Sequence, residues 1–131
     1  MFDARLAPVQ RRLLQPLAQH LHAQGVRADT LTLAGFALGL LAVGAAAAGL
    51  PLLALAGLLA NRLADGLDGA VARLAGPTDR GAFLDIALDF LFYALFPLGF
   101  ALADPAANAL PAAVLIASFI GTGSSFLAFS L

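Results

Sequence analysis

The sequence of 131 residues contains no cysteine, no lysine and no glutamate, and only 11% of its residues are charged. Without cysteine the chain has no disulfide, no thiolate metal ligand and no cysteine nucleophile. A soluble domain usually has about 25% charged and about 45–50% apolar residues, whereas 61% of this chain is hydrophobic. These proportions exclude a water-soluble globular enzyme, and they also exclude disorder, which needs low hydrophobicity. The formal net charge of −1 argues against a nucleic-acid partner, so a few arginines and aspartates must carry the chemistry.

The apolar pattern predicts an all-α fold, a polytopic transmembrane helix bundle with an N-terminal amphipathic helix and four spans. Residues 1–26 are expected to form a juxtamembrane helix that lies at the interface, because leucines recur at helical steps with arginines between them. Residues 27–131 are expected to form the transmembrane catalytic domain. A span needs about 20 apolar residues, and four predicted spans follow one another at about 29–49, 52–74, 80–103 and 109–131. The apolar run of the second span changes character after about Ala60. Asp29 or Thr30 is expected to cap the first of them.

The placement of the arginines predicts the orientation of the spans. Four arginines precede the first span, and Arg73 and Arg80 flank the turn between the second and third spans. The other two turns hold no basic residue. By the positive-inside rule the N-terminus and the arginine-flanked turn face the cytoplasm. We therefore expect a multi-pass integral protein of a bacterial inner membrane, with its site on the cytoplasmic side.

Four aspartates lie inside the predicted second and third spans, where an ionised carboxylate costs about 2.5–3.5 kcal/mol at mid-membrane. Asp65 and Asp68 are i,i+3, and Asp85 and Asp89 are i,i+4, so each pair lies on one helix face. The short turn makes the two spans antiparallel, and a rise of about 1.5 Å per residue places both pairs at similar depths. The four carboxylates should therefore converge, and they must either take up protons or bind cations. All-oxygen ligands suit Mg²⁺ or Mn²⁺, and two such ions would balance the four charges.

Small residues and an arginine accompany the acids. Gly66, Gly69 and Ala72 remove bulk from the same helix, although a glycine within a helix costs about 1 kcal/mol relative to alanine. Arg73 follows Gly69 by one helical turn, and a guanidinium can hold phosphate oxygens with two hydrogen bonds. Metal ions and an arginine beside a glycine-lined cleft indicate a diphosphate site. The alternative is an ion-paired helix hairpin that only packs, but two nearby arginines would leave the charge of four acids uncompensated.

Together these residues resemble the signature of the CDP-alcohol phosphotransferases, also called CDP-alcohol phosphatidyltransferases. The matching pattern is Asp65-x-x-Asp68-Gly69-x-x-Ala72-Arg73, seven further residues, and then Gly81-x-x-x-Asp85-x-x-x-Asp89. Every position of the signature is present. Asp29-x-x-Thr32 also resembles the opening of the family's first span, with aspartate where asparagine is common.

The resemblance implies a metal-dependent transfer reaction in phospholipid biosynthesis. A phosphatidyl-type group would pass from a CDP-linked lipid, such as CDP-diacylglycerol, to the hydroxyl of an alcohol acceptor, and CMP would leave. By the same resemblance, the base that deprotonates the acceptor is Asp89, and two divalent metal ions are bound by Asp65, Asp68, Asp85 and Asp89. The residues implied to line the CDP pocket are Thr32, Gly69, Ala72, Arg73 and Gly81.

Members of this family usually have six spans, whereas four are predicted here. We therefore expect the chain to be a fragment of a longer protein, or to receive its remaining walls from another subunit. Gly35 and Gly39 form a face of small residues that lets helices approach closely in lipid. Packing within the chain is the favoured use of that face, and a homodimer is the alternative.

Three other functions are considered from the residues. An aspartate-rich intramembrane prenyltransferase also binds a Mg²⁺-diphosphate, and Asn61-x-x-x-Asp65 faintly resembles its first motif. The Ala72-Arg73 continuation and the tight hairpin argue against it. A cation channel or transporter would use the acids as a binding ring along a conduction path. A non-catalytic membrane assembly protein would need the acids for complex formation instead of turnover.

Overall fold

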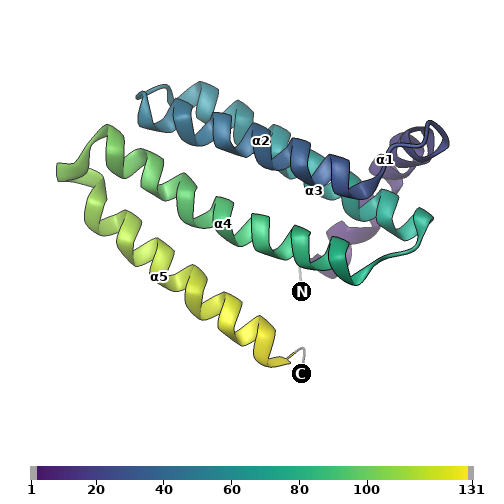
Figure 1. Cartoon of the computed structure of the whole chain (residues 1–131). Coiled ribbons are helices and arrows are strands. Elements are labelled where there is room, and N and C mark those ends of the chain that lie inside the picture. The colour runs from purple at the N-terminus through teal and green to yellow at the C-terminus, as the bar shows by residue number, and fades with distance from the viewer. Residues whose placement is uncertain (1–2, 130–131) are drawn as a thin grey trace.

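The computed structural model describes residues 3–129, which form five α-helices joined by short connections. The predicted all-α fold is confirmed (Figure 1). The helices in chain order are α1 Asp3–Ala23, α2 Ala28–Ala47, α3 Pro51–Ala75, α4 Asp79–Ala103 and α5 Pro105–Phe129. The predicted N-terminal helix corresponds to α1, and its position at the membrane interface stays a prediction.

Residues suited to turns separate the helices. Gly49 and Gly76 follow α2 and α3 with positive φ angles of 73° and 94°, a conformation that side chains with a Cβ rarely adopt. The Oγ1 of Thr78 caps α4 by accepting a hydrogen bond from the backbone N–H of Gly81 at 3.0 Å. The expected cap of the first span is wrong. The helix begins at Ala28 with extended Arg27 before it, so the aspartate and threonine that follow lie in its first turn.

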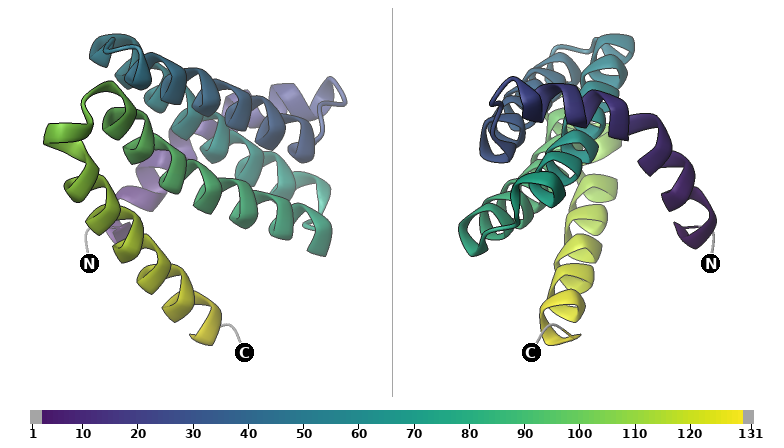
Figure 2. Two further views of the ribbon diagram at one scale, coloured as in Figure 1. Left: turned by 60° about the vertical axis from the view of Figure 1, so that its left-hand side comes forward. Right: turned by 90° about the vertical axis from the view of Figure 1, so that its right-hand side faces the viewer.

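α2 is the helix around which the bundle is built, because it packs against both α3 and α4 (Figures 1 and 2). Glycines make this approach possible. A Cβ at Gly35 would lie 2.9 Å from the Cβ of Ala64 in α3, and one at Gly39 would lie 2.8 Å from the ring of Phe92 in α4. The small face predicted in the first span therefore packs within the chain. α5 packs against α4, and α1 packs against α3 outside the bundle.

Three of the described helices are long and apolar enough to cross a membrane, namely α2, α4 and the segment Pro105–Ser125 of α5. α3 has 25 residues, but its stretch from Arg62 to Arg73 carries four charged side chains, so its composition alone does not identify it as a span. Its first half presents leucines outward, with Leu52 82% and Leu59 62% exposed. Similar apolar side chains cover the outside of the neighbouring helices. Such a surface suits lipid and not water, and the chain is a polytopic helical membrane protein.

The packing of α4 on α2 supplies a first prediction. A Cβ at Gly99 would lie 2.8 Å from the backbone carbonyl oxygen of Val43, an atom that cannot move aside cheaply. Overpacking of this kind costs about 1–3 kcal/mol, so Gly99→Ala should lower the thermal unfolding temperature of the protein in detergent. Gly121→Ala is the matched control, because no described atom beyond its own stretch of helix lies within 4 Å of its Cβ position and alanine favours a helix by up to about 1 kcal/mol. Equal unfolding temperatures for the two variants would contradict this packing.

Candidate active site

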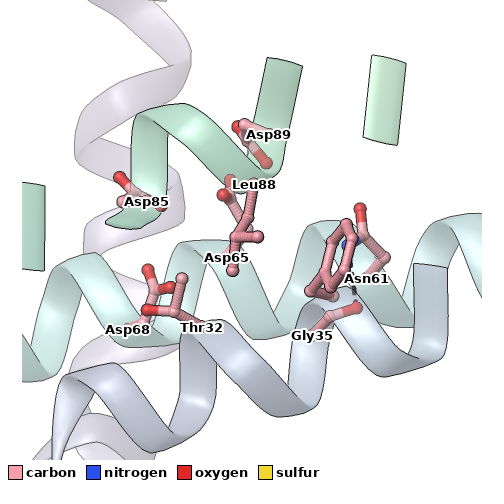
Figure 3. A pocket seen from close by; sticks show the side chains of 9 residues that line it. Thr32, Gly35, Asn61, Asp65, Asp68, Asp85, Leu88 and Asp89 are labelled. Carbon is pink, nitrogen blue, oxygen red and sulfur yellow. Dashed lines mark hydrogen bonds between the residues drawn. The ribbon is translucent and has the colours of Figure 1, made fainter. Parts of the chain in front are cut away.

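Three carboxylates from two helices meet inside the bundle. Asp65 and Asp68 come from α3 and Asp85 comes from α4, and each offers an oxygen within 4.8 Å of the others (Figure 3). The i,i+3 spacing on α3 turns both of its acids to one side, and the antiparallel α4 brings Asp85 to the same depth. Asp68 is only 3% exposed, whereas the other two are partly buried. The predicted convergence is therefore confirmed for these three, which we call the acidic cluster.

One buried oxygen of the cluster has no hydrogen-bond partner among the described residues. Asp68 Oδ2 is buried and accepts no hydrogen bond from any residue that the structure describes. A buried polar atom without a partner is rare, because losing water without compensation costs free energy. A cavity of about 10 Å³, bounded by the acidic cluster and Thr32, lies beside it. This is room for about one water or ion, so the donor set and the space both fit a divalent cation with oxygen ligands.

Asp89, the fourth predicted acid, lies one turn after Asp85 on α4 and borders the same small cavity (Figure 3). Its carboxylate is paired with Arg62: Nη2 donates to Oδ1 at 2.6 Å and Nη1 donates to Oδ2 at 3.3 Å. The hydroxyl of Tyr93 donates to the same Oδ2 at 3.1 Å. The structure therefore differs from the expected convergence of all four acids, because three face one another and the fourth is paired with Arg62. The roles of Asp89 as base and as metal ligand stay predictions.

Sequence reasoning gave Arg62 no role. The available signal was a single arginine three residues before Asp65, in a helix whose residues up to Ala60 are apolar. A cation at that depth is costly unless it faces a partner. What the pattern could not indicate was which of the four aspartates would be that partner.

A larger cavity of about 470 Å³ opens next to the acidic cluster, among α2, α3, the α3–α4 turn and the start of α4. Its volume is in the range of about 300–1,000 Å³ usual for small-molecule sites. Asp68 and Asp85 line both this cavity and the small one. The five residues predicted for the CDP pocket all line it as well: Thr32, Gly69, Ala72, Arg73 and Gly81. We call it the main cavity.

The glycines of the main cavity keep its wall free of side chains. A Cβ at Gly69 would meet nothing closer than Arg73 Nη1, at 3.5 Å. A Cβ at Gly81 would come within 3.0 Å of Thr78 Oγ1 and 3.4 Å of Asp29 Oδ1. Larger residues would therefore fill the space that the structure leaves open. Asp29, the first residue of the family-like opening seen in the sequence, also lines the cavity from the first turn of α2.

A comparison with models of known protein families shows the family to which the chain belongs. A model described as CDP-alcohol phosphatidyltransferase matches residues 26–130. The chain belongs to the CDP-alcohol phosphatidyltransferase family. This is a family of transferases that use CDP-alcohols, so membership favours group transfer over the prenyltransferase and channel alternatives. The matched residues include α2 to α5 and every residue of the two cavities except His22 and Gly25.

The chain is also similar to a curated bacterial protein, the inner membrane protein YnjF of Escherichia coli (strain K12). The two are 55% identical over 130 residues, which is 99% of this chain and 63% of that protein. The chain therefore spans less than two thirds of the length of this relative. No solved structure matches the chain.

Proposed function

We propose that the protein transfers a phosphatidyl-type group from a CDP-linked lipid or alcohol, such as CDP-diacylglycerol, to a hydroxyl acceptor and releases CMP. The observation that carries this proposal is the shared wall of the two cavities. Asp68 and Asp85, two members of the acidic cluster, line the small cavity on one side and the main cavity on the other. A diphosphate at that wall would lie beside the acids, with its nucleoside in a cavity of sufficient size.

Different residues would bind the diphosphate and the nucleoside of this donor. Asp65, Asp68 and Asp85 would hold a divalent cation, Mg²⁺ or Mn²⁺, which when bound would neutralise the diphosphate and stabilise the leaving CMP. The family resemblance implies two ions. Arg73 would bind phosphate oxygens through its guanidinium. The nucleotide could approach the backbone closely at the small residues Gly69, Ala72 and Gly81. Thr32 would form the wall of the nucleotide site on the α2 side.

We assign Asp89 the role of the base that activates the acceptor hydroxyl. Its carboxylate would take the proton of the acceptor hydroxyl, and the oxygen would attack the phosphorus that bears the lipid. The new bond makes a phosphodiester, and the bond from that phosphorus to the CMP oxygen breaks. Arg62 and Tyr93 hold this carboxylate in one orientation, which suits a base that must meet a hydroxyl at a defined angle.

The membrane arrangement follows the same proposal. The relative's name places that protein in an inner membrane, and we propose the same location here, with α1 at the cytoplasmic interface. The main cavity then opens toward the side where the soluble nucleotide is found. It adjoins helices that contact lipid, so a bilayer-anchored donor and CMP can both reach it.

Release of CMP tests the function. The protein, reconstituted in lipid, should release CMP from CDP-diacylglycerol when Mg²⁺ or Mn²⁺ and a suitable acceptor are both present. A panel of glycerol phosphate, inositol phosphate, serine and a second lipid would identify the acceptor class. Absence of CMP release with every acceptor in either metal would contradict the proposal.

The open wall at Gly69 allows the nucleotide site to be tested separately. Gly69→Leu would place a side chain in the main cavity, and we expect the affinity for CDP-diacylglycerol to fall by about tenfold or more, since 1.4 kcal/mol is tenfold. The protein should still fold, because only Arg73 lies near the new Cβ. Gly44→Leu is the control, on an exposed site with no atom within 4 Å. Unchanged donor affinity in Gly69→Leu, measured by titration calorimetry, would exclude this cavity as the nucleotide site.

A further inference from the structure

Helix α1 contributes to the main cavity although it lies outside the part of the chain that matches the family. His22 and Gly25 line the cavity, and the match to the CDP-alcohol phosphatidyltransferase family begins at residue 26. His22 lies in the last turn of α1 and its side chain is exposed. The main cavity therefore has a polar wall residue that the family signature does not account for.

The packing of α1 fixes this wall in place. Ala18 of α1 is 1% exposed and is buried together with Ala70 and Val71 of α3. These two residues of α3 stand in the sequence between Gly69 and Ala72, which line the main cavity. α1 therefore packs on the same stretch of α3 that forms the cavity wall.

Two backbone hydrogen bonds close the end of α1. The N–H of Gly25 donates to the carbonyl oxygen of His22 at 2.9 Å, and the N–H of Val26 donates to the carbonyl oxygen of Leu21 at 3.0 Å. Together with the φ of 78° at Gly25, these bonds form the Schellman motif that ends many helices. The motif fixes the backbone of His22 relative to the start of α2, so the fold itself holds the imidazole at the cavity.

His22 lies at the end of the main cavity that is away from the acids. The α1–α2 and α3–α4 connections are at the same end of the bundle (Figure 1). Asp68 and Gly76 both line the cavity, and they are separated by about 12 Å along α3 at a rise of about 1.5 Å per residue. With the diphosphate beside the acids, the cytidine would occupy the end where His22 lies.

The other polar side chains at this end are already engaged. Arg27 is paired with Asp29 at 3.4 Å, and the hydroxyl of Thr78 caps α4. Among the described residues, none is hydrogen-bonded to the ring of His22. A neutral imidazole has one N–H donor and one acceptor nitrogen, and cytosine presents an amino donor beside acceptor atoms. The ring can therefore form a hydrogen bond with the edge of this base.

We propose that His22 is a specificity-determining residue of the donor site, which hydrogen-bonds the edge of the cytosine base through a ring nitrogen. The inference rests on the proposed function, and it adds a contact to the base from a helix outside the family signature. The base is the same before, during and after transfer, so this contact stabilises the bound substrate and the transition state equally. Uniform binding of this kind lowers KM without raising kcat.

Titration calorimetry with CMP, on the whole protein in lipid nanodiscs, measures the contact directly. In His22→Ala the Kd for CMP should rise by about fivefold, which is the size of one hydrogen bond. His22→Phe keeps a ring but has no ring nitrogen, so it should lose as much affinity. His22→Gln keeps a donor and an acceptor and should lose less. The KM for CDP-diacylglycerol should follow the Kd, and kcat should not fall.

His20→Ala is the matched control. His20 lies two residues before His22, so the two side chains do not share a helix face. Its ring accepts a hydrogen bond from the side-chain amide of Gln24 at 3.0 Å, and it lines neither cavity. This variant should bind CMP as the wild type does.

UMP tests whether the contact is to the base, because UMP differs from CMP only there. The preference of the protein for CMP over UMP should fall by about fivefold in His22→Ala, if one hydrogen bond to the base is lost. Equal losses of affinity for CMP and UMP would place the contact on the ribose or phosphate and overturn the inference.

Unchanged CMP binding in His22→Ala, or wild-type affinity in His22→Phe, would also overturn it. CMP affinity that falls in Gly69→Leu but not in His22→Ala would keep the nucleotide in the main cavity and remove only His22 from its site. Wild-type protein that binds CMP but releases none from any donor would contradict the proposed function. The CMP titrations would still decide the role of His22, so the two failures are distinguishable.

Discussion

Asp89→Asn is expected to abolish transfer, with kcat falling by about a thousandfold, because a positioned general base contributes about 10²–10⁴-fold. Asparagine has nearly the same shape, and its Oδ1 can still accept a hydrogen bond from Arg62, so the helices should remain in place. The carboxylate does not face the main cavity, and the affinity for the CDP-linked donor should therefore be largely preserved. Single-turnover CMP release measures the chemical step, and calorimetry with the donor measures binding.

A matched control exists at the other end of the bundle. Asp104 is exposed in the α4–α5 turn, where its Oδ1 accepts a hydrogen bond from the N–H of Ala107 at 3.1 Å. Asp104→Asn keeps this bond and should transfer normally. Wild-type turnover in Asp89→Asn would remove Asp89 from the mechanism, whereas loss of donor binding in that variant would assign it to the nucleotide site.

Asp68→Asn is expected to separate metal binding from stability. The amide loses one charged ligand oxygen, so the Mg²⁺ requirement for turnover should rise by about tenfold or more, since each added or lost anionic ligand tunes affinity strongly. Without metal the variant should be more stable than the wild type, because Asp68 buries a carboxylate oxygen without a partner and an uncompensated buried charge is destabilising.

Thermal unfolding in EDTA and in Mg²⁺ measures both effects. The wild type should gain stability on adding Mg²⁺, and Asp68→Asn should begin higher in EDTA and gain little. Asp104→Asn again serves as the control and should follow the wild type. An unchanged metal titration, or a variant less stable than the wild type in EDTA, would count against a cation at the acidic cluster.

The helices and the hairpin that carries the site were predictable because their signals are local. Apolar runs of sufficient length predict long helices, and Gly76-Pro77 predicts a break between them. Once α3 and α4 are antiparallel, the i,i+3 and i,i+4 spacings place the acids at one depth, and the positions of Asp65 and Asp85 confirm this. The residues that the family resemblance implies for the nucleotide all line the main cavity, and their role in nucleotide binding stays a prediction.

Side-chain contacts between neighbouring helices were not predictable from the sequence. The pattern placed Asp89 with the other acids, but the i,i+4 step from Asp85 carries it farther along α4, level with Arg62 on α3. Whether a cation or a second carboxylate lies opposite depends on helix rotation, which spacing does not determine. The number of spans is also not settled by composition. Four are predicted, but only three described helices are apolar enough by composition, because the charges of α3 lower its hydropathy although the helix has the length to cross a bilayer.

Anomalous diffraction from crystals of the protein grown with Mn²⁺ and a CDP-alcohol tests the central claim most directly. The account predicts a manganese peak bounded by Asp65, Asp68 and Asp85, with the diphosphate beside it and the cytidine in the main cavity near Gly69 and Arg73. A peak elsewhere, or a nucleotide bound away from the acidic cluster, would contradict it.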